Sequence, residues 1–249
     1  MSRRFIYWLL LTGWTQGALA AVALLPVTVD LNDSASLQRG AKLFMNYCSG
    51  CHSLRYMRYN RLASDLGLTT EDGAIDKSLL VNNLIFTTAK IHDPIEISMP
   101  QADARQWFGM PPPDLSLIAR EHSPSWLYTY LNGFYVDKTR PFGGNNLLVP
   151  DVGMPNVLAP LKGEVKAVSQ KDGTYLYDQL PPQLVVVKPG EMSGPQFDRA
   201  LCDLVTFLVY VAEPTKLIRI RIGIFVMLYL ALFLVVAYQL NKFYWRKIS

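Results

Sequence analysis

The chain has little cysteine and little charge, and it lacks several signatures common in enzymes. Only three of its 249 residues are cysteine, so it is not a small domain held together by disulfides. The sequence contains no internal repeat, phosphate-binding glycine loop or nucleophile elbow. Charged residues make up 18% of the chain, against roughly 25% in soluble domains, whereas 50% are hydrophobic. This imbalance indicates that part of the apolar surface faces lipid.

The basic excess lies at the two ends of the chain. The net charge is +4, but no acidic residue precedes Asp30 or follows Glu213. Eight of the 24 basic residues lie in these end segments: Arg3, Arg4, Lys216, Arg219, Arg221, Lys242, Arg246 and Lys247. Residues 21–215 carry 16 basic and 20 acidic residues, a balance of −4. An acidic body with basic ends argues against a nucleic-acid partner.

The N-terminus has the pattern of a secretory signal peptide. Arg3 and Arg4 precede an apolar stretch over residues 5–11, and an A-x-A cleavage site ends at Ala20. The alternative is an uncleaved anchor, because apolar residues resume at 21–25. The pattern predicts export of the remainder of the chain.

A second apolar segment near the C-terminus has the length of a membrane span. Residues 222–240 are 19 consecutive residues without a charge, and as a helix they would cover about 28 Å, close to the hydrocarbon thickness. Tyr244 and Trp245 extend an interfacial aromatic belt at its end. Basic residues flank both ends, so the export signal rather than the positive-inside rule sets the orientation.

The segment Cys48-Ser49-Gly50-Cys51-His52 is a C-x-x-C-H motif, which is typical of covalent haem attachment. Cysteines three residues apart share one face of a helix, so each can form a thioether with one haem vinyl group. The next residue, His52, can then bind the iron as proximal ligand. The motif predicts one covalently bound haem c.

Two other interpretations of the cysteine pair are weaker. A zinc site needs about four ligands, and only Cys202, His92 and His122 remain to supply the others. A thioredoxin-like site should follow a strand, whereas the apolar spacing predicts a helix over residues 36–48. Cys202 lies on another expected helix, over residues 197–211, and we interpret it as a buried small apolar residue.

A c-type haem commonly takes a methionine sulfur as its second axial ligand. Four methionines are candidates, and the first three precede a proline that stiffens the loop: Met99, Met110, Met154 and Met192. His92 or His122 would instead give bis-histidine ligation. The chemistry of the residues does not choose among these.

Other segments of the chain resemble the cytochrome c1 family, the haem subunits of the ubiquinol–cytochrome c reductase (cytochrome bc1) complex. The resemblance is carried by R-G-A-K-L-F (39–44), C-S-G-C-H-S-L-R-Y (48–56), M-P-P-P-D-L-S (110–116), D-V-G-M-P (151–155) and the single C-terminal anchor. It implies a mainly α fold: a class I cytochrome c-like haem domain with long loops plus one C-terminal transmembrane helix. The first and last helices of such a domain pack together, which would place Gly40 and Phe44 against Phe207 and Leu208.

The resemblance also implies roles for single residues. These are Cys48 and Cys51 as thioether positions, His52 as proximal ligand, Met154 as distal ligand, Arg120 at a haem propionate, and Pro112 and Pro113 against the haem face. A guanidinium suits a carboxylate such as a propionate. Taken alone, the residues around Pro112 indicate only a turn, with a helix starting near Asp114.

The expected function is electron transfer by a membrane-anchored haem. The resemblance implies that a Rieske iron–sulfur protein delivers the electrons, a soluble cytochrome c or similar carrier accepts them, and cytochrome b packs against the anchor. Ubiquinol oxidation would occur in cytochrome b, so this chain alone is not expected to catalyse it. The alternative is an anchored haem c electron-donor subunit of another oxidase or reductase complex.

The sequence thus predicts three parts. Residues 1–20 are a signal peptide, residues 21–215 a periplasmic c-type haem domain, and residues 216–249 a membrane anchor with a short cytoplasmic tail, its span at about 222–240. The expected location is the bacterial inner membrane, with a single pass. Helices are also expected over 124–132 and a short strand over 184–187, whereas residues 69–113 show weak periodicity.

Overall fold

Helices dominate the structure, a computed structural model that describes residues 23–97, 99–168 and 183–246. The helices are α2 (Ser34–Tyr47), α3 (Tyr59–Asp65), α4 (Lys77–Leu84), α5 (Gln101–Phe108), α6 (Ile118–Glu121), α7 (Pro124–Asn132), α8 (Ala159–Lys162), α9 (Gly194–Ala212) and α10 (Lys216–Trp245). The strands are β1 (Leu54–Arg58), β2 (Pro94–Ile95), β3 (Phe134–Val136), β4 (Gly144–Asn146), β5 (Gly163–Val168) and β6 (Gln183–Pro189). They form antiparallel pairs, β1 with β2, β3 with β4 and β5 with β6. The predicted signal peptide, residues 1–20, lies outside the described residues.

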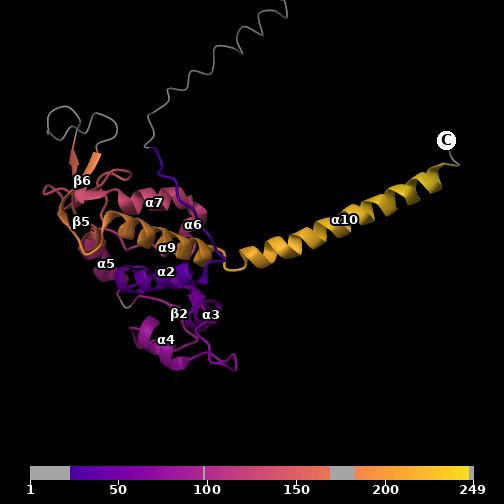
Figure 1. Ribbon diagram of the computed structural model, residues 1–249, viewed down its shortest axis with the longest axis horizontal. Coiled ribbons are helices and arrows are strands. Elements are labelled where there is room, and N and C mark those ends of the chain that lie inside the picture. Colours follow the sequence, from indigo (N-terminus) through magenta and orange to yellow (C-terminus); the bar gives the residue numbers. More distant parts are fainter. Residues whose placement is uncertain (1–22, 98, 169–182, 247–249) are drawn as a thin grey trace, which may run out of the picture.

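Helices α2 and α9 cross in close contact and form the centre of the globular part of the chain (Figure 1). At the crossing, a Cβ atom on Gly40 would lie 2.2 Å from the backbone oxygen of Asp203 and 2.7 Å from Cβ of Phe207. Only glycine permits this approach. The rings of Phe44 and Phe207 pack with their centroids 5.7 Å apart, and Leu208 belongs to the same buried core. The predicted contact between the first and last helices of the domain is confirmed.

A buried carboxylate fastens the same two helices. Asp203 of α9 is 8% exposed, and one of its oxygens accepts a hydrogen bond from Oγ of Ser36 at 2.6 Å. Arg39 of α2 donates from Nε at 2.6 Å and from Nη2 at 3.0 Å to the two carboxylate oxygens. Because burial of an unpaired carboxylate is costly, these three donors make the crossing specific.

Helix α10 extends away from the globular part of the chain (Figure 1). This helix of 30 residues is long and apolar enough to cross a membrane, and none of its residues is buried. The proposed span over residues 222–240 lies within it. Together with the mainly helical globular part and its long loops, α10 agrees with the predicted fold class.

One local expectation, a helix starting near Asp114, was wrong, and other elements are longer or more numerous than the sequence indicated. The weakly periodic region 69–113 contains α4 and α5, two helices of eight residues each. The helix expected near Asp114 begins only at Ile118, because the Asp114 side chain accepts a hydrogen bond from the backbone N–H of Ser116 and forms a turn instead. The strand expected over 184–187 is the longer β6, and its partner β5 was not predicted.

Candidate haem site

The two cysteines of the motif follow directly on the end of α2. The backbone N–H groups of Cys51 and His52 both donate to the carbonyl of Cys48, at 3.0 and 2.9 Å, so the motif forms a tight helical turn. Cys48 is buried, Cys51 is partly buried, and both thiols are free. Burial, with a smaller contribution from Cys51, raises the pKa of the Cys48 thiol to about 12.

The donor set around these cysteines does not suit zinc. A zinc site needs about four ligands. In the described ranges, no group of three His, Cys, Asp or Glu residues is placed to hold a metal ion. The residues that would have to complete a zinc site do not form such a group with the cysteine pair: His92 is exposed, and Cys202 lies on α9. The C-x-x-C-H motif is left with its haem interpretation.

A backbone carbonyl fixes the orientation of His52. Nδ1 of this ring lies 2.8 Å from the carbonyl oxygen of Pro113. Because a carbonyl only accepts, Nδ1 carries the proton and the lone pair of Nε2 stays available for a metal. Burial lowers the pKa of His52, which favours the neutral imidazole that binds iron.

The proline-rich segment lies directly alongside the haem-attachment motif. The N–H of Leu115 donates to the carbonyl of Ser53 at 2.9 Å, and Oγ of the fully buried Ser116 accepts from the N–H of Tyr56 at 3.1 Å. The Asp114 carboxylate accepts from the N–H of Arg55 at 3.0 Å. These bonds join segments about 60 residues apart and hold Pro113 beside His52.

Pro112 and Pro113 belong to this segment beside the motif, and their contact with the haem face stays a prediction. Pro112 is partly buried and Pro113 is exposed. No residue pattern indicated the contact with His52, because it uses the backbone carbonyl of Pro113 and not its ring. Arg120 lies on α6 and is exposed, with no side-chain hydrogen bond or ion pair to any described residue.

Met154 packs partly buried against the main core. The hydroxyl of Tyr130, on α7, donates to its sulfur at 3.4 Å, and burial raises the pKa of that hydroxyl to about 12. Tyr130 in turn stacks on Trp126 with ring centroids 5.2 Å apart, and Trp126 stacks on His122 at 3.8 Å. Trp126 and Tyr130 share one face of α7 because they lie four residues apart, and His122, which precedes the helix, extends the stack.

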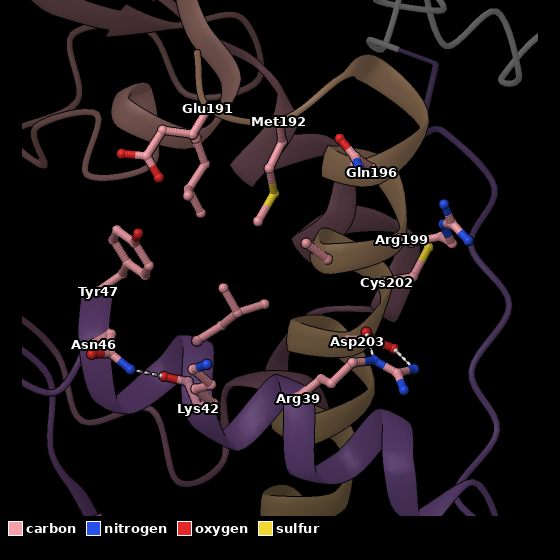
Figure 2. A pocket seen from close by; sticks show the side chains of 13 residues that line it. Arg39, Lys42, Asn46, Tyr47, Glu191, Met192, Gln196, Arg199, Cys202 and Asp203 are labelled. Atoms are coloured by element: carbon pink, nitrogen blue, oxygen red, sulfur yellow. Dashed lines mark hydrogen bonds and ion pairs between the residues drawn. The ribbon is translucent and has the colours of Figure 1, made fainter. Parts of the chain in front are cut away.

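The other methionines have different surroundings. Met110 is 66% exposed, and Met99 is partly buried on the loop before α5. Met192 points into a pocket between α2 and α9 (Figure 2), where Tyr47 and Cys202 are also among the lining residues. Cys202 is therefore only partly buried, although it packs against the core as an apolar residue. Apart from Met192, one of the four candidate methionines, no residue proposed to contact haem lines this pocket.

The residues present at the motif fit a haem c. Two free thiols lie one helical turn apart, followed by an imidazole whose Nε2 is available. The core that contains Cys48 also has aromatic and aliphatic side chains packed against it that are only partly buried, among them Leu115, Ile118, Trp126, Tyr130 and Met154. A flat, apolar macrocycle suits such a surface.

Comparison with known proteins places the chain among haem proteins. The model of the cytochrome C1 family matches residues 27–248. The chain is 48% identical to cytochrome c1 of Allochromatium vinosum, over 88% of this chain and 87% of that protein. It is 41% identical to the ammonia monooxygenase gamma subunit of Nitrosomonas europaea, over 88% of this chain and 86% of that protein, and 27% identical to cytochrome c1 of Rhodospirillum rubrum, over 87% and 83%. Since the family match covers nearly all of the described chain, including the histidine that Pro113 orients, the chain belongs to the cytochrome c1 family and carries one covalently bound haem c.

Proposed function

We propose that this chain is the haem subunit of a ubiquinol–cytochrome c reductase, in which it accepts electrons from a Rieske iron–sulfur protein and passes them to a soluble cytochrome c or a similar carrier. The observation that carries the proposal is the family match over residues 27–248 together with the oriented His52 imidazole. When bound, the haem supplies a one-electron iron couple. The protein holds that group, sets its ligands and presents its edge to partners.

Each residue at the site has a distinct task in this proposal. Cys48 and Cys51 would form the thioethers, and His52 through Nε2 and Met154 through its sulfur would hold the iron. The carbonyl of Pro113 holds the His52 ring in one tautomer and one orientation. The remaining contacts come from Arg120 at a propionate and from Pro112 and Pro113 against the haem face.

The anchor defines how the subunit sits in its complex. We infer a cleaved signal peptide at 1–20, a periplasmic domain at 21–215, and an anchor with a cytoplasmic tail at 216–249, in the inner membrane of a bacterium. Helix α10 is exposed on all sides, so part of it remains available to cytochrome b as well as to lipid. Side chains exposed along a membrane helix are the surface through which partner helices pack.

Co-purification tests the assembly. The full-length chain with a C-terminal affinity tag is solubilised from its native membranes in mild detergent, and the bound proteins are identified by mass spectrometry and by their haem b and iron–sulfur spectra. Cytochrome b and a Rieske protein in fixed proportion to this chain are expected. Their absence from a preparation that retains haem c and other stable partners would contradict the proposal.

Two sets of variants test the site. Changing Cys48 and Cys51 together to Ala should abolish haem staining on a denaturing gel, because both thioether sulfurs are lost. Met154→Leu should retain covalent haem but lose the far-red sulfur-to-iron charge-transfer band and lower the reduction potential, since thioether sulfur favours ferrous iron. Met110→Leu is the matched control, because Met110 is 66% exposed. Loss of the band in Met110→Leu and its survival in Met154→Leu would show that the ligand is wrongly assigned.

A second candidate keeps the haem but changes the complex. The relative from Nitrosomonas europaea, 41% identical, carries the name of an ammonia monooxygenase subunit. This name favours an anchored haem c donor to another oxidase or reductase as the alternative. The same co-purification separates the two, because a monooxygenase or other terminal enzyme would then replace cytochrome b and the Rieske protein among the bound chains.

A further inference from the structure

The loop that carries Met154 contains a backbone conformation that needs support. Asp151 has φ = 62° and is the only non-glycine residue with a positive φ among those the structure describes. This left-handed conformation is unfavourable for most side chains, although Asp tolerates it better than others. Asp151 lies three residues before Met154, so the direction of the chain at this residue determines where the methionine enters the site.

One arginine, Arg140, contacts both the backbone and the side chain of Asp151. Nη2 of Arg140 donates to the carbonyl oxygen of Asp151 at 2.8 Å, and its Nη1 lies 2.9 Å from Oδ1 of the same residue. The two contacts use the planar fork of the guanidinium, which a lysine cannot reproduce. The Nε atom of Arg140 is buried and has no hydrogen-bond partner among the described residues. An unpaired buried donor costs free energy, and the side chain keeps this position in spite of that cost.

The arginine is itself held rigidly. Strands β3 and β4 form a hairpin, and Arg140 lies in its turn, where its N–H donates to the carbonyl of Asp137 at 3.2 Å and its carbonyl accepts from Gly143 at 3.0 Å. The Asn145 side chain, 1% exposed, accepts from the N–H of Asp151 at 2.9 Å and donates to Asp137 at 3.1 Å. The hairpin thus provides a fixed platform from which the distal loop is held at the backbone N–H, the carbonyl and the carboxylate of one residue.

We propose that Arg140 is a positioning residue for the distal haem ligand. Its two contacts hold the left-handed turn at Asp151, and this turn keeps the Met154 sulfur at the iron; the proposal therefore rests on Met154 being the ligand, as argued under the proposed function. Without these two contacts, which we call the Arg140 clamp, the backbone of Asp151 relaxes toward the extended region and the Met154 sulfur leaves the iron more often. An iron–sulfur bond that opens more often exposes the iron to competing ligands.

The experiment measures ligation in the full-length haem protein in detergent. Arg140→Gln removes the charge and the fork, Arg140→Lys keeps only the charge, and Lys138→Gln is the control, since Lys138 is exposed in the same turn and has no ion pair with a described residue. The readouts are the far-red charge-transfer band of the ferric protein during heating and the rate of carbon monoxide binding to the ferrous protein. Arg140→Gln is expected to lose the band at a lower temperature and to bind carbon monoxide at least tenfold faster, with Arg140→Lys between it and the wild type.

Variants at Asp151 separate positioning from general stability. Asp151→Asn keeps an acceptor oxygen and tolerates positive φ, so it should resemble the wild type, whereas the β-branched Asp151→Val should match Arg140→Gln or exceed it. Far-ultraviolet circular dichroism should show the same helix melting in all of these variants. If Arg140→Gln and Asp151→Val behave like Lys138→Gln while Met154→Leu abolishes the band, the clamp is refuted and the ligand assignment stands. If Met154→Leu keeps the band, the ligand assignment itself fails.

Discussion

Substituting Gly40 with alanine tests whether the crossing of α2 and α9 determines where the haem motif lies. The added Cβ would approach the backbone oxygen of Asp203 to 2.2 Å and Cβ of Phe207 to 2.7 Å. Overpacking typically costs about 1–3 kcal/mol, and the upper end applies because a backbone carbonyl cannot rotate away as a side-chain end can. Alanine returns up to about 1 kcal/mol of helix propensity. The expected net loss in the free energy of unfolding is about 2 kcal/mol.

The consequence should reach the haem, because Cys48 caps the C-terminus of the same helix. We expect the Gly40→Ala holoprotein to lose its haem circular-dichroism signal about 4–8 °C below the wild type, at roughly 2–4 °C per kcal/mol for a chain of this size. The matched control is Gly194→Ala, at the start of α9, where a Cβ would meet no atom within 4 Å. A Gly40→Ala protein that melts with the wild type would show that the helices separate freely and that the close crossing is unimportant.

Three other predictions concern buried polar groups. Burial lowers the pKa of Lys162 to about 8 from 10.5, so between these pH values the unfolded chain holds a proton that the folded chain has released. The free energy of unfolding of the wild type should therefore rise with pH across this window relative to that of Lys162→Met. We expect a rise of no more than about 3 kcal/mol, as measured by urea denaturation. Asp203→Ala leaves Arg39 without its partner and removes a buried tie between α2 and α9, so the free energy of unfolding should fall by about 1–3 kcal/mol in the same assay. Tyr130→Phe removes the hydrogen bond that draws electron density from the Met154 sulfur, and the reduction potential measured by redox titration should therefore decrease; an increase would contradict this.

The parts of the fold that the sequence predicted are those with strong local signals. Helix α7 has the predicted bounds because Ser123 caps its first turn and Pro124 occupies its first position, both of which are readable from sequence. Helices α2 and α9 were predicted within a few residues from their apolar spacing. Helices α4 and α5 are short and present only one or two buried residues each, so their apolar pattern is too weak to detect.

The site shows the same division between local and long-range information. The C-x-x-C-H motif is contiguous, so its chemistry could be predicted. The bond from His52 to Pro113 joins a ring to a backbone carbonyl 61 residues away, and no residue type marks such an acceptor. The left-handed turn at Asp151 was also unpredictable, because aspartate is not glycine and the arginine that holds it lies 11 residues earlier in the sequence.

Removal of the anchor tests whether the haem domain is an independent unit. A stop codon after Thr215 deletes α10, which is exposed along its whole length and contributes nothing to the buried core. Among the described ion pairs, the truncation breaks the one between Arg219 and Glu213. We expect haem-loaded protein in the soluble periplasmic fraction. Aggregated protein without haem would show that the anchor or its partner helices are needed for folding.

The truncated domain should also reveal the charge of its electron acceptor. Residues 21–215 have a balance of −4, and ionised haem propionates make the surface more acidic, so a basic cytochrome c should be steered toward it. Asp76 accepts a hydrogen bond from the N–H of Leu79 and Asp72 accepts one from Thr70, and because both donors are uncharged, these carboxylates keep their charge and add to the overall field. Salt weakens such a field because the Debye length shrinks to about 10 Å at 0.1 M. The rate of electron transfer to a basic cytochrome c, measured by stopped flow across a salt series, should fall as salt rises. A rate that rises with salt would instead indicate an acidic acceptor or docking on a basic patch, and the steering argument would fail.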